Sequence, residues 1–400
     1  MFRRIYLDNS ATTPIDPRVV EAMMPFLTDK FGNASSIHHF GQEAKTAVDR
    51  ARHQVAALVG ARPNEIIFTS GGTESNNLSI RGLLESPTVR NSLSDGDRPH
   101  VITSAIEHSA VKNVCEYLEK SGVEVTYLPV YENGIVRLAD LEAAMRDNTV
   151  LVTIMAANNE IGTLQPIEEI GKLVRSMRAE GKKIWFHTDA VQAVGKIPLN
   201  VADIGCDLLS MSAHKLYAPK GIGALYVRRG VRLQPQNIGG HQERDVRGGT
   251  EPVPSVVAFG AACEIAESEM EQDAANCQAL RNDLENSIGE RIPDVHFNGD
   301  REERLPNIAN VSFGSIEGEG LLINLDMQGI AVSTGSACSS GTLEPSPVIR
   351  ALGRNDELAR GAIRFSFGKF NTKEELDALL RVLPSSIENL RSLHPRAASN

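Results

Sequence analysis

Lys215 is the first residue whose type and setting could support chemistry. It ends the sequence Ser-Ala-His-Lys at residues 212–215, which directly follows a segment with the character of a strand. A lysine amine that is desolvated or has cationic neighbours loses its proton more easily, and the neutral amine is a nucleophile toward aldehydes. The alternative is a solvated surface lysine. Position 215 is therefore a candidate nucleophile that needs support from other residues.

Asp189 is a candidate acid beyond the end of another predicted strand. It lies in Phe-His-Thr-Asp-Ala-Val-Gln at residues 186–192. Open α/β sheets bind their ligands beyond the carboxyl ends of their strands, and a carboxylate there can keep a heterocyclic nitrogen protonated. The alternative is that Asp189 caps the turn that follows.

A glycine turn supplies the third feature. Residues 68–77 read Phe-Thr-Ser-Gly-Gly-Thr-Glu-Ser-Asn-Asn, between a predicted strand and a predicted helix. Glycines let the backbone approach a ligand, and a helix start offers N–H groups to an anion. The spacing is that of neither a Walker loop nor a G-x-G-x-x-G fingerprint, and the turn could be structural. A lysine, an acid and a phosphate cup together are what pyridoxal phosphate requires of a protein.

Four short segments add a resemblance to a known family. Residues 6–13, 31–33, 157–160 and 214–215 read YLDNSATT, FGN, ANNE and HK. With the three features above, they resemble the cysteine desulfurases of the NifS/IscS group, which belong to the class V aminotransferase family of pyridoxal-phosphate enzymes. The resemblance covers nearly the whole chain. It implies the PLP-dependent transferase fold of type I and conversion of L-cysteine to L-alanine with transfer of sulfur.

Cys338 is the residue that favours this group within the family. It lies in Ser-Thr-Gly-Ser-Ala-Cys-Ser-Ser-Gly at residues 333–341, where the neighbours are small. A buried structural cysteine normally has apolar neighbours at the period of a helix or strand, so Cys338 is expected to be exposed. The alternative is a cysteine without a role in a loop. The resemblance implies that Cys338 accepts the sulfur as a persulfide.

The resemblance also implies how the cofactor is held. Lys215 binds it covalently and then moves the Cα proton, Asp189 keeps the ring nitrogen protonated, and His108 stacks on the ring and assists proton transfer. Gln192 and Asn158 bond the region of the phenolic oxygen. The residues implied for the phosphate are Gly72, Thr73, Ser212 and His214.

Substrate and partner contacts follow from the same resemblance. Arg364 binds the carboxylate of L-cysteine, a role that suits a planar guanidinium, with Asn33 and Asn158 nearby. His38 lies near the substrate or is a satisfied loop histidine. Thr250 matches a threonine that reaches the phosphate of the neighbouring subunit, which implies a homodimer with shared sites. The persulfide would pass to an acceptor protein such as an iron–sulfur scaffold.

Other functions stay open at this point. One is a selenocysteine lyase, and another is a different class V aminotransferase, which needs no thiol at position 338. A third is a scaffold protein that keeps the fold but has lost the chemistry, although Lys215, Asp189, His108 and Cys338 are all present.

The elements that must position these residues are predicted as an α/β fold. Seven short apolar runs predict a mostly parallel sheet that is buried on both faces, because helical segments separate them. They are residues 65–69, 100–103, 123–127, 150–155, 183–187, 207–211 and 224–227. We predict a large cofactor-binding domain at residues 16–262. A smaller α+β domain is predicted from residues 1–15 and 263–400, with a long helix at 256–288 between the two parts and a surface loop at 84–99.

Composition excludes several other classes of protein. The net charge of −10 argues against a partner that is nucleic acid or anionic membrane, and no apolar run approaches the ~20 residues needed to span a bilayer. The five cysteines show no zinc spacing and are odd in number, so we expect no metal site and no disulfide framework. The other four cysteines are expected to be packing residues. A soluble cytoplasmic enzyme fits these features.

Overall fold

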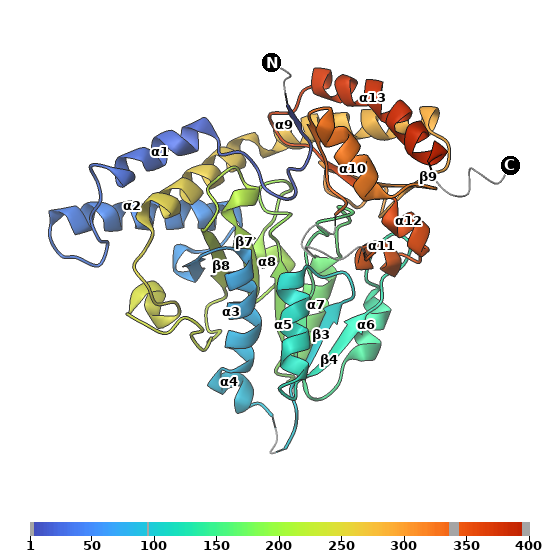
Figure 1. The fold of residues 1–400 in the computed structure, drawn as a ribbon. Helices are drawn as coiled ribbons and strands as arrows, with labels where there is room; N and C mark the ends of the chain where they lie inside the picture. Colours follow the sequence, from blue (N-terminus) through green and yellow to red (C-terminus); the bar gives the residue numbers. More distant parts are fainter. Residues whose placement is uncertain (1–3, 94–95, 336–343, 394–400) are drawn as a thin grey trace.

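A seven-stranded sheet forms the centre of the molecule (Figure 1). The computed structural model describes residues 4–93, 96–335 and 344–393. The strand order is β2-β8-β7-β6-β5-β3-β4, and only β8 runs antiparallel to its neighbours. The strands are β2 (Ile66–Thr69), β3 (His100–Ser104), β4 (Glu124–Leu128), β5 (Thr149–Thr153), β6 (Trp185–Asp189), β7 (Leu208–Ser212) and β8 (Gly223–Val227). The predicted mostly parallel sheet is confirmed.

Helices cover both faces of this sheet. Ile66 and Phe68 of β2 belong to one apolar core, while Ile67 between them belongs to the core on the opposite face. This alternation follows from the two-residue period of a strand. The helices of this part are α1 (Pro17–Leu27), α2 (His39–Leu58), α3 (Gly72–Leu84), α4 (Pro87–Arg90), α5 (Ser109–Glu119), α6 (Leu138–Ala144), α7 (Ile167–Ala179) and α8 (Val201–Ile204), with short 3₁₀ turns η1 (Pro63–Glu65), η2 (Ala213–Lys215) and η3 (Gln242–Asp245).

The C-terminal part has its own apolar core. A three-stranded antiparallel sheet has the order β12-β10-β9. Ile5 and Tyr6 pair in parallel with Ile330 and Ala331, so the N-terminal residues pack with the C-terminal part, as expected. The elements are β1 (Ile5–Tyr6), β9 (Val295–Phe297), β10 (Ile308–Phe313), β11 (Ile330–Ala331), β12 (Ala362–Ser366), α10 (Gly318–Met327), α11 (Pro347–Ala351), α12 (Asp356–Arg360) and α13 (Lys373–Ser392).

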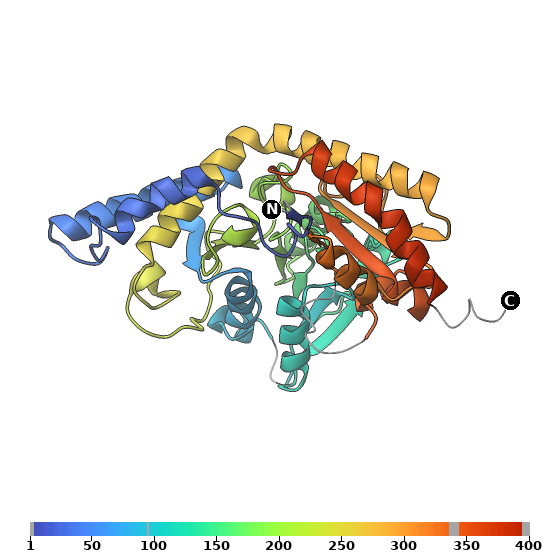
Figure 2. The same ribbon diagram turned by 45° about the horizontal axis from the view of Figure 1, so that its top comes forward.

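One long helix, α9 (Val253–Arg291), joins the two parts and runs along the molecule in Figure 2. Phe259 in its first half belongs to the core that includes the central sheet, and Leu284 in its second half belongs to the C-terminal core. The helix continues without a break past residue 262. The division into domains at that residue stays a prediction.

The polar segment after α3 differs in part from the predicted loop. Helix α3 extends to Leu84, and Ser86 caps the short helix α4 by accepting a hydrogen bond from the Val89 N–H. Pro87 at the first helical position suits a helix start, which explains why a proline-containing loop holds a turn of helix. In the part of the chain that the structure describes, no helix is long and apolar enough to cross a membrane.

Candidate active site

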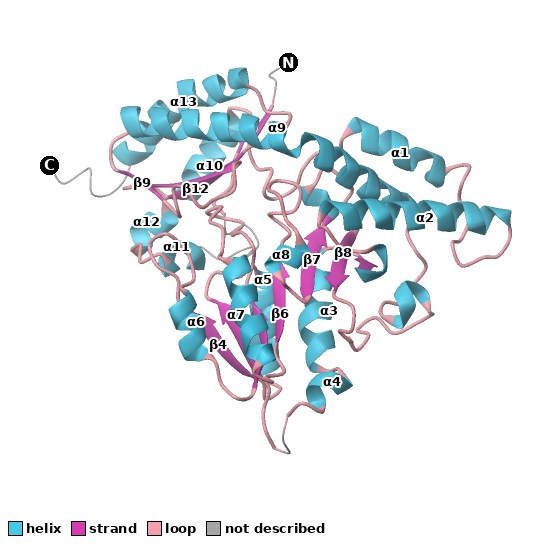
Figure 3. Cartoon of the chain, turned by 180° about the vertical axis from the view of Figure 1, so that it is seen from behind, coloured by secondary structure: helices cyan, strands magenta, loops and turns pink. Residues whose placement is uncertain are grey.

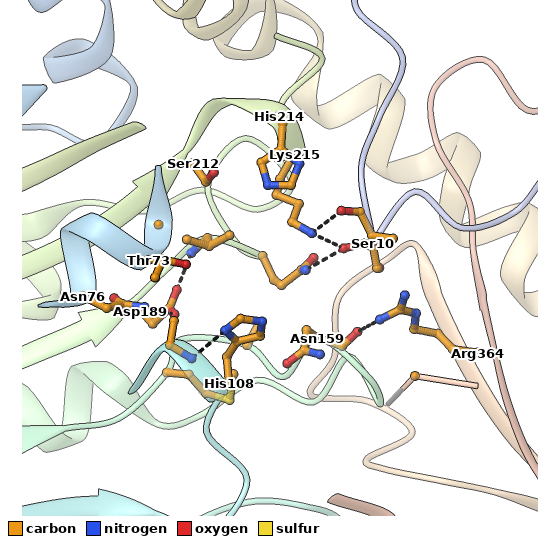
Figure 4. A pocket seen from close by; sticks show the side chains of 18 residues that line it. Ser10, Thr73, Asn76, His108, Asn159, Asp189, Ser212, His214, Lys215 and Arg364 are labelled. Carbon is orange, nitrogen blue, oxygen red and sulfur yellow. Dashed lines mark hydrogen bonds between the residues drawn. The ribbon is translucent and has the colours of Figure 1, made fainter. Parts of the chain in front are cut away.

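A cavity of ≈ 260 Å³ lies beyond the carboxyl ends of the parallel strands. Figure 4 shows side chains that point into it from opposite sides, with Lys215 and Ser10 facing Asp189 and His108 across the space. This is the place where open α/β sheets bind ligands. The structure brings nine of the predicted site residues to this one cavity, and they are Gly72, Thr73, His108, Asp189, Gln192, Ser212, His214, Lys215 and Arg364.

Lys215 ends the 3₁₀ turn that follows β7. Its Nζ donates to the carbonyl oxygens of Ser10 at 2.5 Å and Ala11 at 2.6 Å. These carbonyls belong to the N-terminal segment, whose residues Ser10 and Ala11 line the cavity. The amine is thus held at the cavity wall by two neutral acceptors.

Asp189 is the last residue of β6 and is almost fully buried. Its Oδ2 accepts a hydrogen bond from Asn76 Nδ2 at 2.7 Å, and its Oδ1 accepts one from the Val191 N–H at 3.0 Å. Both carboxylate oxygens are therefore held by N–H donors. The capping interpretation is correct for Oδ1, yet the same carboxylate also lines the cavity.

The start of α3 forms a second side of the cavity. Gly72 and Thr73 are its first residues, and the N–H groups in a first helical turn have no acceptor within the helix. A Cβ at Gly72 would come within 2.8 Å of Val191 Cγ2, so only glycine lets the helix start lie this close to the turn after β6. Such a helix start attracts an anion.

His214 and Ser212 lie next to this helix start. Burial, followed by the charge of Lys215, lowers the pKa of His214 to about 4. The ring is therefore neutral near pH 7, and its Nδ1 lies 3.2 Å from Thr12 Oγ1. Ser212 ends β7 and faces the same cavity. Together these side chains offer short polar groups to an anion at the helix start.

His108 caps the N-terminus of α5 and lines the cavity. Its Nδ1 accepts the Ala110 N–H at 3.1 Å, so in the neutral ring the proton lies on Nε2. Behind it, Glu107 Oε1 accepts bonds from Ser104 Oγ at 2.7 Å and the Met155 N–H at 2.9 Å. Burial raises the pKa of Glu107 to about 8, which makes this carboxyl largely neutral at pH 7.

Arg364 enters from β12, on the side opposite the large sheet. Its Nη2 donates to Asp8 Oδ1 at 2.7 Å and its Nη1 to the Asn159 carbonyl at 2.7 Å. Its Nε is buried and has no partner among the described residues. An arginine that is 3% exposed with one N–H unsatisfied is prepared for a further acceptor.

Asn158 does not reach the cavity, in contrast to the prediction, and Asn159 lines it instead. The Asn158 side chain is turned to the backbone, because its Nδ2 donates to the Ile106 carbonyl and its Oδ1 accepts the N–H groups of Glu160 and Ile161. These three bonds close the turn after β5. The side chain of Asn158 is thus committed to that turn.

Asn33 and Thr250 are exposed and do not line the cavity of their own chain. Asn33 Oδ1 accepts the Ser35 N–H at 2.9 Å within a loop. His38 caps α2, and its Nδ1 accepts the Gly41 N–H at 3.3 Å, which favours the interpretation of a satisfied loop histidine.

The four cysteines predicted to be packing residues are all buried, and they are Cys115, Cys206, Cys263 and Cys277. Burial raises the pKa of each thiol above its usual range, to about 12 for Cys115 and Cys277. Thiolates are therefore strongly disfavoured at these positions. Cys338 lies outside the described residues.

Sequence reasoning missed several cavity residues. Ser10, Asn76 and Gly335 line the cavity without having been assigned there. Asn76 was within the glycine-turn segment and one helical turn after Gly72, which was a usable signal. Gly335 lies in the segment at residues 333–341 that was singled out for Cys338, three positions before that cysteine, which was a second usable signal.

Comparisons with known proteins agree with this geometry. The family model for aminotransferase class-V matches residues 5–379. The chain is 50% identical over 395 residues to "Cysteine desulfurase IscS" of Dictyoglomus turgidum, covering 99% of this chain and 97% of the relative. It is 52% identical over 396 residues to the protein of the same name from Salmonella typhi, covering 98% and 94%.

Solved structures give the same result. A "NIFS-LIKE PROTEIN" superposes with a TM-score of 0.88 at 39% identity, over 97% of this chain and 100% of that one. A structure described as "SspA in complex with cysteine" superposes with a TM-score of 0.79 at 37% identity, over 92% and 100%. The chain therefore belongs to the aminotransferase class-V family, and within it to the cysteine desulfurases.

Proposed function

We propose that this protein converts L-cysteine to L-alanine with pyridoxal phosphate and passes the sulfur through a persulfide on Cys338 to an acceptor protein. The observation that carries the proposal is the convergence of Lys215, Asp189 and Arg364 on one cavity. An amine, a carboxylate and a guanidinium at these positions match the aldehyde, ring nitrogen and substrate carboxylate of such a reaction.

The donor set fits pyridoxal phosphate. The open start of α3 with Ser212 and His214 suits a phosphate, and Asp189 suits a protonated ring nitrogen. Bound pyridoxal phosphate supplies an electron sink for the charge left when the Cα proton departs. Lys215 would hold the aldehyde of the cofactor, and the carbonyls of Ser10 and Ala11 accept hydrogen bonds from its free amine.

Arg364 and Asn159 bind the substrate. The unsatisfied Nε of Arg364 and the adjacent Nη2 form an edge that suits a bidentate carboxylate. We assign to Asn159 the substrate contact that the sequence assigned to Asn158, because Asn159 lines the cavity. Asp8 and the Asn159 carbonyl hold the guanidinium in place.

We assign the removal of the Cα proton to Lys215, because its amine lines the cavity and a neutral amine can act as a base. His108 lies on the opposite side of the cavity in Figure 4. With its proton on Nε2, it can donate a proton to the departing product. The neutral Glu107 behind it avoids placing a second negative charge beside Asp189.

Cys338 takes the sulfur. Its thiolate forms a bond with the sulfur of the substrate while the carbon–sulfur bond breaks, and the electron pair of that bond stays with the carbon, which is protonated to give alanine. The burial and raised thiol pKa of the other four cysteines support this assignment by elimination. A thiol chemistry of this kind suits the reducing cytoplasm.

A homodimer completes the proposed site. Thr250 is exposed and away from the cavity of its own chain, which suits a residue that reaches the phosphate of a neighbour. Apolar side chains are exposed as well: Phe31 and Ile37, in the loop between α1 and α2, are 71% and 93% exposed, and Ile238 is 86% exposed. The paired helices α1 and α2 project from the body (Figure 3). Such a surface suits a second copy of the chain, and light scattering should give twice 43.4 kDa.

The first experiment measures sulfide and alanine formed from L-cysteine in the presence of a reductant. Wild type, Cys338→Ser and the matched control Cys277→Ala are compared, each first checked for the yellow absorbance of bound cofactor. We expect wild type and Cys277→Ala to form sulfide and alanine in equal amounts. Cys338→Ser should be yellow and inactive.

Three further results would distinguish the candidate functions that are still open. If yellow Cys338→Ser were as active as wild type on L-cysteine, Cys338 would not be the sulfur acceptor. Much faster turnover of selenocysteine than of cysteine by the wild type would favour the lyase. Transfer of ³⁵S from the loaded enzyme to a purified iron–sulfur scaffold tests the acceptor, and Cys338→Ser should transfer none.

A further inference from the structure

Lys196 is a half-buried lysine without a role in the site described so far. It follows β6 by seven residues, and its Nζ donates to Gln192 Oε1 at 3.0 Å. The amide Nε2 of Gln192 donates in turn to the Ser10 carbonyl at 3.0 Å. That carbonyl also accepts from Lys215 Nζ. The two lysines are thus linked through one amide and one carbonyl.

The donors and acceptors in this chain fix the orientation of the Gln192 amide. A backbone carbonyl can only accept, so the NH₂ group of Gln192 must face Ser10. This orientation turns the amide oxygen toward Lys196, whose Nζ donates to it, and the ammonium form of Lys196 can only donate. A flipped amide would set oxygen against oxygen at Ser10 and N–H against N–H at Lys196.

We propose that Lys196 is a positioning residue that holds the Gln192 amide with its nitrogen toward the cavity, so that the site presents an N–H donor to an oxygen of the bound cofactor. This inference rests on the proposed function. Gln192 lines the cavity, and its nitrogen carries a second N–H beyond the one bonded to Ser10. A donor at this place selects an anionic or acceptor oxygen and excludes a donor.

Placing the amine of Lys196 here costs free energy, which supports a role for this amine. Burial and then the charge of Lys215 lower the pKa of Lys196 to about 7. A methionine would fill similar space without desolvating an amine beside a second lysine. The amine lies within hydrogen-bond distance of the amide oxygen of Gln192, which is the contact that a methionine could not make.

The experiment titrates apoprotein with pyridoxal 5′-phosphate and follows its absorbance band and dissociation constant. In Lys196→Met the dissociation constant should rise about five- to tenfold, which is the effect of one lost or misdirected hydrogen bond, and the band should move. Lys196→Arg keeps a donor and should retain the wild-type band. The control Lys182→Met removes a lysine that pairs with exposed Asp147 and should change neither.

A double-mutant cycle with Gln192→Ala identifies the path of the effect. If Lys196 acts through Gln192, Lys196→Met combined with Gln192→Ala should bind cofactor no more weakly than Gln192→Ala alone. Additive effects, or an unchanged band and affinity in Lys196→Met, would overturn the inference. A wild type that binds no pyridoxal phosphate would overturn the proposed function itself.

Gln192→Glu provides a second variant should Lys196→Met fail to fold. The new carboxylate keeps its partner Lys196 but has no N–H to offer the cavity. We expect weaker cofactor binding and a moved band in a folded protein. Unchanged binding and an unchanged band would contradict the proposed orientation of the amide.

Discussion

Two sets of residues line the cavity, and they come from different parts of the fold. The set that we call the sheet wall consists of Asp189, Ser212, Lys215 and His108, and each ends a strand of the central sheet or follows one within four residues. The far wall consists of Ser10, Gly335 and Arg364, which come from the N-terminal segment and the C-terminal part. Arg364 contacts Asp8 across 356 positions of sequence and Asn159 across 205.

The supports of these walls differ. The backbone of the sheet wall is held by the hydrogen-bond ladders of β3, β6 and β7, which belong to one sheet. The far wall combines separate segments: Arg364 lies on β12, which pairs with β10, and the Asp8–Arg364 ion pair and the backbone bonds between Ser333 and Arg364 join the segments. The groups that we propose to bind the cofactor lie mainly on the first wall, and the group proposed for the substrate carboxylate lies on the second. The comparison predicts that damage to the sheet wall affects turnover, whereas damage to the far wall affects substrate binding.

Lys215→Ala should have the largest effect. Removing the amine eliminates both the covalent attachment of the cofactor and the base for the Cα proton, so turnover should fall by roughly 10³-fold or more. The measurement is alanine formation with excess cofactor. Lys220→Ala, five positions along and exposed, is the matched control and should be fully active. Substantial turnover in Lys215→Ala would remove this residue from the mechanism.

Asp189→Asn should come next. The substitution keeps the shape of a side chain that accepts bonds from Asn76 and Val191, but it removes the negative charge. Turnover should fall by about 10²-fold, as when one preorganised electrostatic group is lost, with the Michaelis constant nearly unchanged. The exposed Asp203→Asn serves as control. A turnover number within twofold of wild type would mean that Asp189 is only a capping residue.

The sheet wall is also the part that could be predicted from sequence. Apolar runs predicted all seven strands within two residues, and a side chain directly after a strand end is placed by that strand. Lys215 and Asp189 were therefore found by local pattern together with the resemblance.

On the far wall, Arg364 was assigned from the resemblance, but Ser10 and Gly335 were not assigned to the site. The contacts of Ser10 and Gly335 depend on how distant segments pack, which no local period encodes. Asn158 and Asn159 show another limit of prediction from sequence. The two residues are adjacent and identical, so the sequence pattern does not tell which of them lines the cavity. The turn after β5 decides which side chain bonds the backbone and which faces the cavity.

Arg364→Lys should change substrate binding at the far wall without changing cofactor binding at the sheet wall. A lysine keeps the charge but loses the fork that can bind a carboxylate in two places. The Michaelis constant for L-cysteine should rise roughly 10- to 100-fold, while cofactor affinity stays at the wild-type value. Arg350→Lys, in an exposed pair with Asp356, is the control. If cofactor affinity fell and the Michaelis constant did not change, Arg364 would belong with the sheet wall.

The smallest expected effect is on acid stability, and it depends on His187 beneath the sheet wall. His187 lies two residues before Asp189 and links three strands, because its ring nitrogens bond Thr153 Oγ1 at 2.8 Å and Ser210 Oγ at 3.0 Å. Burial lowers the pKa of His187 to about 3. The folded protein therefore keeps this ring neutral over a range in which an unfolded chain, with a pKa near 6.5, binds a proton.

Stability should consequently be complete above pH ~6.5 and decline as the pH falls toward ~3, by at most ~1.4 kcal/mol per pH unit for this histidine. His187→Gln removes the titrating group, so its free energy of unfolding should depend less steeply on pH in that window. Urea unfolding at several pH values measures the slope, and exposed His53→Gln should keep the wild-type slope. Equal slopes in His187→Gln and wild type would show that the ring is not held neutral. A reduced slope with normal activity at pH 7 would show that the interior of the sheet wall supports its geometry without taking part in the chemistry.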